Sequence, residues 1–529
     1  MLISHLKEII RKTLPQDIDF TLEVPPDKKF GDMACNAAML LAKKLGKNPR
    51  ELAEEIKNKL EENKLVKRVE IAGPGFLNLF LAAEIFQQIL LKIEEKGKDF
   101  ARVDIGHGEK TLLEFISANP TGPLTIANGR GGFGGDVVAR VLERAGYDVS
   151  REFYVNDAGR QIELLGKSLQ LAKGGSQFAK NEIKDFYQGE YIQDLAKKHA
   201  EKITADALET GRVFLQILLE EEIKPAVAKM GIKFDKWFSE TSLRDGGELK
   251  KTLDFFEKKK LTYKKDGALF LQTSKFADDK DRVIVKSNGD LTYVLPDLMY
   301  HKNKFERGFT KLIDILGADH HGYVPRLKVG VQMLGFGEVE VIITQLVKLF
   351  RKGKEVRMSK RAGNFELMDD LIAEVGADAA RWFFVMRDWN THLNFDLDLA
   401  KKQSSDNPVF YVQYAHTRMA SILEKAGNVN WSGSDVTLLE QGEEFDLIKK
   451  LSGLPNLVEE ISDSYEVHRL TNFARELAEI FHRFYEKCRV IDEKNLELTR
   501  ARLRLVEVAK EVLKIVLEDL VGVSAPEKM

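Results

Sequence analysis

The spacing of apolar and polar residues indicates a small α/β unit at the start of the chain. The opening run MLISHLKEIIRKTL places its apolar residues on one face of a predicted helix, with charged residues opposite. A second helix is predicted to begin near Asn48-Pro49. The run VEIAGPGFLNLFL then predicts two short strands separated by its central GPG.

The middle of the chain alternates strand-like and helical patterns. They follow one another from Thr111 to about Phe384, an order typical of a mostly parallel sheet. The pair Asn288-Gly289 predicts a hairpin turn between two β-rich runs, DRVIVK and LTYVL. Between positions 165 and 265 charged helical patterns dominate, which predicts an insertion or a helical layer.

Beyond about residue 400 the strand signals disappear. The remaining segments have helical periodicity, which predicts an α-helical bundle. The fold class is therefore α/β with a C-terminal helical part. We predict three domains, with boundaries at residues 1–105, 106–400 and 401–529.

Composition narrows the classes of protein. The 81 basic and 83 acidic residues give a formal net charge of −2, so any binding to nucleic acid must use local patches. Cys35 and Cys488 are the two cysteines, which excludes a disulfide framework and a cysteine-based zinc cluster and favours a reducing, cytoplasmic compartment. No uncharged apolar run is long enough to predict a membrane span.

A glycine-rich stretch is the first candidate for chemistry. SANPTGPLTIANGRGGFGGD, residues 117–136, follows a β-like run and precedes a helical pattern. Glycines let backbone N–H groups approach a ligand, and a helix N-terminus favours phosphate. The stretch matches neither GxxxxGK[ST] nor GxGxxG. These residues alone leave two interpretations open, a nucleotide-binding turn or glycines that let another element pack closely.

Three further segments narrow the choice: REFYVNDAGRQIELLG, LTYVLPDLMYHKNKF and GKEVRMSKRAGNF. A strand, glycine turn and helix with RMSKR far downstream resembles the paired nucleotide-binding loops of class I aminoacyl-tRNA synthetases. Within that class the chain resembles the arginyl-tRNA synthetase family over nearly its whole length, from EFISANPTGPL through GADHHGYVPR to the terminal GVSAPEKM.

The resemblance implies a Rossmann-like catalytic domain and the activity of an arginine–tRNA ligase. Such an enzyme activates L-arginine with ATP and transfers it to the 3′ end of tRNA(Arg), releasing AMP and pyrophosphate. It also implies ATP with Mg²⁺ and no zinc, a cytoplasmic monomer without a membrane partner, and activation that waits on bound tRNA. No nucleophile is needed, because the protein positions reactants and stabilises charge on the phosphates.

The family usually carries His-x-Gly-His in the glycine turn, and here Thr125, Ile126, Ala127 and Asn128 stand at those positions. Neither Thr125 nor Asn128 can carry positive charge, so basic residues of RMSKR should supply it. The resemblance implies catalytic roles for Thr125, Asn128, Arg357, Ser359 and Lys360, and ATP contacts for Pro123, Ala127, Gly129, Met358 and Arg361. Alternatively, Thr125 and Asn128 simply cap the following helix, and RMSKR is a solvated basic turn.

The amino-acid pocket must hold a planar guanidinium, which carboxylates and flat acceptors suit. The resemblance implies arginine-binding roles for Glu114, Asn119, Tyr293, Asp297 and His321. Asp297 should bind the guanidinium with help from Tyr293, although Tyr293 alone could be a core aromatic. We expect the carboxylates of Asp297 and Glu114 to be buried and to be partnered by substrate or water. His320 and His321 should point in opposite directions on an extended chain, with a weak preference for His321 in the pocket.

The flanking domains are implied to bind RNA. The N-terminal module resembles the one that contacts the D-loop at the tRNA elbow, and the helical domain resembles an anticodon-binding bundle. The residues implied to contact tRNA are Tyr411, Gln413, Tyr414, Arg418 and Met529, with His416 beside them; those of the helix could instead be core residues at helical spacing. Two rival hypotheses remain: a tRNA-binding paralogue without catalysis, and a class I synthetase for another amino acid.

Overall fold

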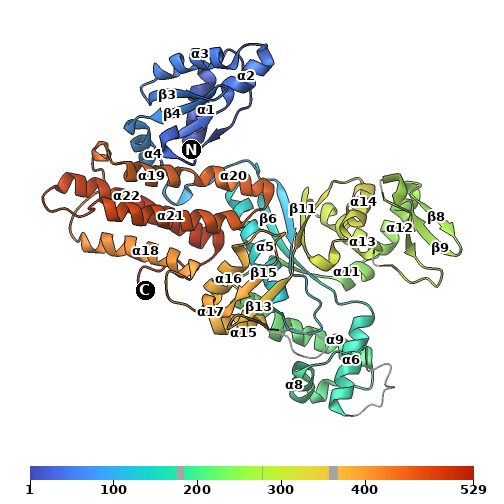
Figure 1. Ribbon diagram of the computed structural model, residues 1–529. Helices are drawn as coiled ribbons and strands as arrows, with labels where there is room; N and C mark the ends of the chain where they lie inside the picture. The colour runs from blue at the N-terminus through green and yellow to red at the C-terminus, as the bar shows by residue number, and fades with distance from the viewer. Residues whose placement is uncertain (175–183, 277, 293, 357–366) are drawn as a thin grey trace.

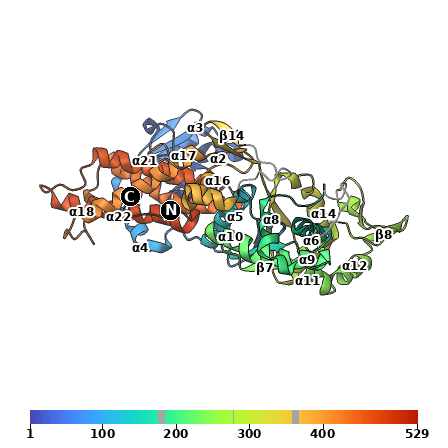
Figure 2. The ribbon, with the colours of Figure 1, turned by 90° about the horizontal axis from the view of Figure 1, so that it is seen from below.

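The computed structural model of the chain describes residues 1–174, 184–276, 278–292, 294–356 and 367–529. Figure 1 shows three parts: an N-terminal module, a central region around a parallel sheet, and a helical bundle. Seen from below in Figure 2, the bundle lies at one end of an elongated molecule and strand β8 at the other.

The N-terminal module confirms the predicted small α/β unit. Its antiparallel sheet has the strand order β1-β2-β4-β3. The Asn48 side chain accepts a hydrogen bond from the Arg50 N–H at the start of α3, which is why that helix begins there. The elements are α1 (Leu2–Thr13), β1 (Leu22–Glu23), β2 (Met33–Cys35), α2 (Ala37–Leu45), α3 (Pro49–Glu61), β3 (Val66–Ala72), β4 (Phe76–Leu81) and α4 (Ala83–Lys96).

A five-stranded, all-parallel sheet forms the centre of the molecule, as predicted. Its strand order is β12-β11-β5-β6-β7. The chain adds β6 and β7 on one side of β5, then crosses to the other side and adds β11 and β12. In such sheets, ligands bind outside the carboxyl ends of the strands where the order reverses. The elements are β5 (Lys110–Glu114), α5 (Ala127–Arg144), β6 (Asp148–Val155), β7 (Lys236–Ser239), β11 (Lys311–Gly317), α14 (Val324–Leu334) and β12 (Val339–Thr344).

Helices dominate residues 165 to 265 as predicted, but β7 and β8 (Thr262–Lys265) lie within that stretch too. In the described part of the chain the helices there are α6 (Arg160–Lys173), α8 (Glu190–Lys198), α9 (Ala207–Leu218), α10 (Lys224–Lys229), α11 (Glu240–Asp245) and α12 (Glu248–Lys258). β9 (Ala268–Leu271) and β10 (Arg282–Val285) complete a small antiparallel sheet with β8.

The predicted hairpin around Asn288-Gly289 is wrong in its second strand. The turn is present, with Gly289 at φ +88°, but a single bridge joins Val285 to Leu291. Strand β10 pairs with β9 instead. The run LTYVL leads into helix α13 (Val294–Glu306), which therefore carries Asp297 in its first turn.

A second small sheet follows the parallel one. β13 (Val347–Arg351) pairs with β14 (Lys354–Val356) and with β15 (Leu393–Asp396). Between β14 and β15 the described helices are α15 (Met368–Val375) and α16 (Ala377–Val385), and α17 (Leu397–Ala400) follows β15. Residues 357–366, between β14 and α15, include RMSKR and lie outside the described part.

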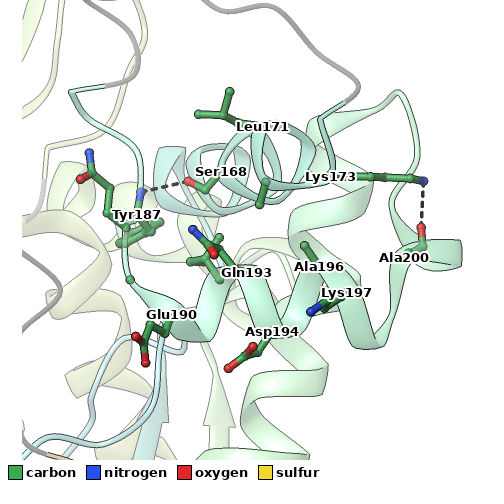
Figure 3. A pocket seen from close by; sticks show the side chains of 14 residues that line it. Ser168, Leu171, Lys173, Tyr187, Glu190, Gln193, Asp194, Ala196, Lys197 and Ala200 are labelled. Atoms are coloured by element: carbon green, nitrogen blue, oxygen red, sulfur yellow. Dashed lines mark hydrogen bonds between the residues drawn. The ribbon is translucent and has the colours of Figure 1, made fainter.

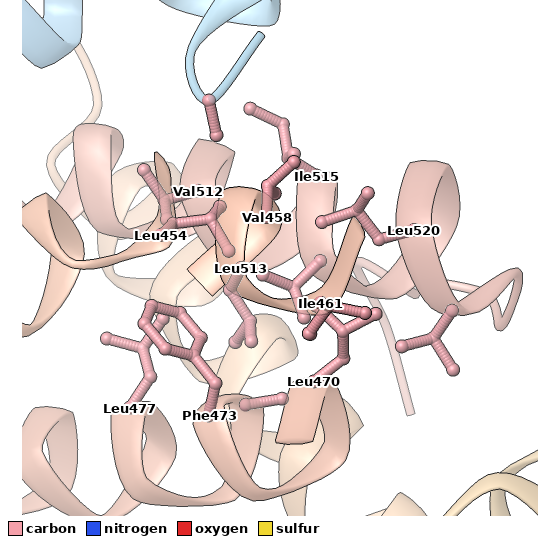
Figure 4. Close-up of a cluster of buried hydrophobic side chains, with 14 of the residues drawn as sticks. Leu454, Val458, Ile461, Leu470, Phe473, Leu477, Val512, Leu513, Ile515 and Leu520 are labelled. Carbon is pink, nitrogen blue, oxygen red and sulfur yellow. The ribbon is translucent and has the colours of Figure 1, made fainter. Parts of the chain in front are cut away.

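The C-terminal region is the predicted helical bundle. Its buried core includes Leu454, Ile461, Leu470 and Leu513 (Figure 4). Its elements are α18 (Pro408–Lys425), α19 (Gly442–Ser452), α20 (Leu454–Ser464), α21 (His468–Lys487), α22 (Leu496–Lys514) and the π-helix η9 (Ile515–Val521). None of the described helices is long and apolar enough to cross a membrane.

Candidate active site and RNA-facing surface

The glycine turn connects β5 to α5 at the point where the strand order of the parallel sheet reverses. Asn128 Oδ1 accepts hydrogen bonds from the backbone N–H of Thr125 at 3.0 Å and from its hydroxyl at 3.2 Å. Helix α5 begins at Ala127, with Ile126 at its N-cap and no side-chain cap bond. Simple capping by Thr125 and Asn128 is therefore wrong: the two side chains close the turn on each other.

The glycines of α5 make room for neighbouring elements. A Cβ on Gly129 would lie 2.6 Å from Met368 Cε and from Phe384 Cζ. The interpretation that these glycines permit close packing is thus confirmed for Gly129, which is buried. Ala127 is exposed at the first position of the helix, and Pro123 is half-buried. Ala127 and the half-buried Asn128 are thus more accessible than Gly129, and the predicted ATP contacts of this turn stay predictions.

Glu114 lies at the end of β5 and is 8% exposed. Its Oε2 accepts a hydrogen bond from Lys304 Nζ at 2.7 Å, and its Oε1 accepts one from the Ser117 hydroxyl at 2.9 Å. The expectation that substrate or water must partner this carboxylate is wrong, because protein donors already do so. Asn119 is exposed on the turn beyond it, within 3.3 Å of Asn156.

Asp297 projects from the first turn of α13. The Tyr323 hydroxyl donates a hydrogen bond to Asp297 Oδ2 at 2.5 Å, so this carboxylate too has a protein partner, contrary to expectation. Burial raises the pKa of Asp297, the Tyr323 hydrogen bond and His301 oppose that rise, and Asp314 and Glu240 add to it. Among the described residues no lysine or arginine forms an ion pair with Asp297, so this carboxylate suits a cationic ligand.

Several residues around Asp297 carried no sequence prediction. Glu240, 6% exposed, begins α11 and pairs with Arg244 at 2.6 Å. His301 and Lys304 follow Asp297 by one and two helical turns. They would have been found as a polar stripe at i, i+4 and i+7 had the segment been predicted as helix.

The two adjacent histidines do not lie on extended chain. Ala318–His320 forms a 3-10 turn directly after β11, and both His320 and His321 are exposed. The turn arises where the chain leaves the sheet edge, so the expected alternation of side chains does not apply. The preference for His321 over His320 stays a prediction.

The remaining residues of the predicted site lie outside the described part of the chain. They are Tyr293, Arg357, Met358, Ser359, Lys360 and Arg361. Among the residues that the structure does describe, no group of three or more histidine, cysteine, aspartate or glutamate side chains could hold a metal ion.

A cavity of about 1150 Å³ lies between α6 and α8, away from these side chains. Figure 3 shows Ser168 and Lys173 on one side of it and Gln193 and Asp194 on the other. None of the predicted arginine or ATP residues lines it. The site at the sheet edge is therefore defined by its side chains rather than by this cavity.

On the bundle, α18 and α21 share an aromatic and basic surface. The ring of Tyr414 is stacked with that of His482 at 6.2 Å, and the Tyr411 ring lies 5.4 Å from His482. Arg418 donates to the Tyr414 hydroxyl at 3.0 Å. Tyr414 is 41% exposed, so it is not a core residue. We call Tyr411, Tyr414, Arg418 and His482 the aromatic surface.

Gln413 and His416 of the same helix point inward. The Gln413 amide donates to Asp378 Oδ2 at 2.8 Å and to the Ser524 carbonyl oxygen at 3.0 Å. His416 is 1% exposed and bonds the Pro526 carbonyl oxygen. Both hold the C-terminal tail, so the core alternative applies to them. Met529, at the end of that tail, is 54% exposed.

Family models match almost the entire chain. They are the arginyl tRNA synthetase N-terminal domain at residues 1–81, the class I (R) tRNA synthetase catalytic domain at 87–396, and the DALR anticodon binding domain at 412–529. A curated arginine–tRNA ligase of Listeria monocytogenes is 44% identical, covering 100% of this chain and 98% of its own.

Solved structures of arginyl-tRNA synthetases resemble this chain as well. A putative arginyl-tRNA synthetase from Campylobacter jejuni is 33% identical with a TM-score of 0.77, over 85% of this chain and 100% of its own. The arginyl-tRNA synthetase of Thermus thermophilus has a TM-score of 0.79 at 20% identity over 100% of both chains, a likeness of fold. The central sheet with its flanking module and bundle is thus the class I synthetase fold.

Proposed function

Because this chain belongs to the arginyl-tRNA synthetase family, we propose how its residues divide the work of charging tRNA with arginine. The chain is an arginine–tRNA ligase of class I, which joins L-arginine to tRNA at the expense of ATP. The individual roles of its residues are our proposal. The observation that carries it is a carboxylate, Asp297, left without a cationic partner in the described structure beside the end of β5.

Asp297 receives the substrate guanidinium. Its surroundings raise its pKa, so a permanently charged guanidinium gains by pairing with it. Tyr323 fixes one carboxylate oxygen, and Tyr293 is proposed to assist. Glu114 acts indirectly, because Lys304 and Ser117 already donate hydrogen bonds to its two oxygens. The exposed Asn119 and His321 contact the substrate directly.

The glycine turn and the RMSKR segment bind ATP, carried with Mg²⁺ as its counterion. The Asn128 side-chain N–H groups donate no hydrogen bond within the described residues, so they are available to a phosphate. Ala127, exposed at the first turn of α5, lies against the nucleotide with Pro123, while Gly129 permits the packing beneath. Met358 and Arg361 complete the ATP contacts, and Arg357, Ser359 and Lys360 contact the leaving pyrophosphate.

The flanking domains hold tRNA(Arg). The aromatic surface on α18 and α21, with Met529, suits splayed bases of the anticodon. The N-terminal module contacts the tRNA elbow. We further propose that the enzyme acts as a cytoplasmic monomer and that arginine activation waits on bound tRNA.

Substitution of Asp297 tests the amino-acid site. The Asp297→Asn and Asp297→Ala variants should lose at least ~100-fold in kcat/KM for arginine, about 3 kcal/mol, because a charge-assisted pair is lost. The KM for tRNA should stay near wild type. In the wild type, the arginine KM should rise as pH falls, because protonated Asp297 cannot pair with the guanidinium.

The pH profile separates direct from indirect effects. The rise of the arginine KM at low pH is the acid limb of this profile. Since the pKa of Asp297 is raised, the acid limb should lie above the ordinary pH range in which a carboxyl group titrates. The Asn variant should show no such limb. A near-wild-type arginine kcat/KM in Asp297→Ala would remove this residue from the pocket.

A further inference from the structure

Three carboxylates stand side by side across the centre of the parallel sheet. The strand registers pair Asp314 of β11 with Glu114 of β5, and Glu114 with Glu152 of β6. Their exposed fractions are 2%, 8% and 0%. We call these residues the acidic row. Buried like charges on adjacent strands repel strongly, so the row requires compensating cations.

Helix α13 and the residue just beyond it supply those cations. Lys304 is fully buried and donates from Nζ to Glu114 Oε2 at 2.7 Å and to Asp314 Oδ1 at 2.8 Å. Arg307 forms two hydrogen bonds with Glu152, at 2.5 and 2.8 Å. Burial alone would lower the pKa of Lys304, but the two carboxylates raise it, so Lys304 is charged.

His301 of α13 contacts the acidic row as well. Its Nδ1 lies 2.8 Å from the carbonyl oxygen of Asp297, and its Nε2 lies 2.9 Å from Asp314 Oδ2. The carbonyl oxygen of Asp297 can only accept a hydrogen bond. Burial alone would raise the pKa of Asp314, but Lys304 and His301 hold it well below its usual range. Lys304 also donates to Asp314, so an ionised Asp314 gives each ring nitrogen of His301 an acceptor, an arrangement that suits an imidazolium.

Asp297 differs from the carboxylates of the acidic row because no described residue forms an ion pair with it. Lys304, Arg307 and His301 contact the carboxylates of the acidic row, and Glu240 pairs with Arg244. The titratable groups near Asp297 include His301 on its own helix, Asp314 on β11, Tyr154 on β6, Glu240 on α11 and Tyr323 before α14. No residue of the described chain forms an ion pair with Asp297. Its negative charge is therefore available to a cationic substrate group.

We propose that His301 is a positioning residue of the arginine site: as an imidazolium it completes the neutralisation of the acidic row and keeps Asp297 ionised for the guanidinium. The inference rests on the proposed function, in which Asp297 binds that group. Without the imidazolium, Asp314 would act on Asp297 uncompensated, and like-charge repulsion would favour a proton there over arginine. His301 also bonds the Asp297 backbone, so it fixes both the position and the charge of that residue.

Two substitutions that change the local charge in opposite directions test the role of His301 in the full chain. His301→Gln keeps a donor for Asp314 but removes the positive charge, so the acid limb of the arginine KM should move up by about one pH unit. Asp314→Asn removes a negative charge, so the limb should move down. The double variant His301→Gln/Asp314→Asn should return the limb to its wild-type position.

A matched control separates charge from loss of packing. His199→Gln changes another buried histidine, 3.5 Å from the carboxylate of Glu221 in the helical insertion. It should leave the acid limb in place. The KM for ATP and the melting temperature are recorded for each variant, because a purely structural role of His301 would change these without moving the limb.

The outcomes distinguish the positioning role of His301 from the proposed binding of arginine by Asp297. If His301→Gln leaves the limb unmoved, or if the double variant shifts as far as His301→Gln alone, the role of His301 is overturned. Should His301→Gln fail to fold, the downward shift of Asp314→Asn decides in its place. The Asp297→Asn variant is assayed alongside: if it retains the limb and binds arginine normally, the proposed arginine site itself falls.

Discussion

At the scale of single residues, the turn before α5 replaces imidazoles with Thr125 and Asn128. Asn128 Oδ1 accepts hydrogen bonds from Thr125, and its side-chain N–H groups donate none within the described residues. The double variant Thr125→Ala/Asn128→Ala should lower kcat, by roughly 1 kcal/mol for each donor that acts in the transition state. Steady-state kinetics with varied ATP measures the loss.

Asn128→Asp sharpens this test because it keeps the acceptor for Thr125 but replaces the N–H donors with a negative charge. It should raise the ATP KM and lower kcat while the melting temperature stays near wild type. His at both positions should leave activity intact, or raise it at low pH where imidazole is charged. A folded double-Ala enzyme with unchanged kcat would mean that the turn only shapes the site.

Residue motifs in the sequence were enough to select Asp297 and Glu114, but not to say how each one acts. Glu114 was expected to face substrate, whereas Lys304 and Ser117 occupy both of its oxygens. That pairing depends on a helix and a strand that are 190 residues apart in the chain, a separation no local pattern encodes. The role of a carboxylate follows from its partners, which only the fold brings together.

At the scale of elements, periodicity predicted the parallel sheet and the bundle but not α13. LTYVL is rich in β-formers, and the Asn288-Gly289 turn before it favours a hairpin. Strand β10 is an end strand of its sheet, and the run returns along its open edge through a single bridge, Val285 to Leu291, before helix α13 begins at Val294. Tertiary context outweighed local propensity there, and the polar stripe of α13 was missed as a result.

Helix α5 offers a matched pair of glycine substitutions that tests close packing. A Cβ on Gly134 would lie 2.2 Å from Trp389 Cη2, whereas on Gly131 the nearest atom is Ile315 Cγ2 at 3.8 Å. Gly134→Ala should therefore destabilise the protein by about 1–3 kcal/mol through overpacking. Gly131→Ala should stabilise it by up to about 1 kcal/mol through helix propensity.

Thermal unfolding of the two single variants under identical conditions measures the difference. The melting temperature should fall for Gly134→Ala and rise slightly for Gly131→Ala. Equal melting temperatures would show that α5 can shift away from Trp389 without cost. The glycines would then need an explanation other than packing.

At the scale of the whole molecule, helix α4 joins the N-terminal module to the bundle. The rings of Phe86 and Phe445 stack at 4.9 Å, and Arg504 pairs with Glu94 at 2.5 Å. Arg381 of α16 donates to Asp136 of α5 at 2.6 Å and to the carbonyl oxygen of Val521 at 3.2 Å. Polar and aromatic contacts thus link the N-terminal module to the bundle, and the bundle to the helices of the catalytic domain.

The arrangement predicts that tRNA recognition and arginine recognition can be changed separately. Tyr414 on the aromatic surface lies in a different part of the fold from Asp297, so Tyr414→Ala should raise the tRNA KM about 10-fold or more through lost stacking on a base. The arginine and ATP KM values should not change. Tyr414→Phe, which loses the Arg418 hydrogen bond but keeps the ring, should stay close to wild type.

Salt dependence completes this test in the intact enzyme. Contacts with phosphates release counterions, so the tRNA KM of wild type and variants alike should rise steeply with salt. Base stacking carries no such dependence, and the ratio between Tyr414→Ala and wild type should hold as salt increases. A wild-type tRNA KM in Tyr414→Ala at every salt concentration would place the anticodon contact elsewhere on the bundle, because an exposed ring that a base stacks on cannot be removed without loss.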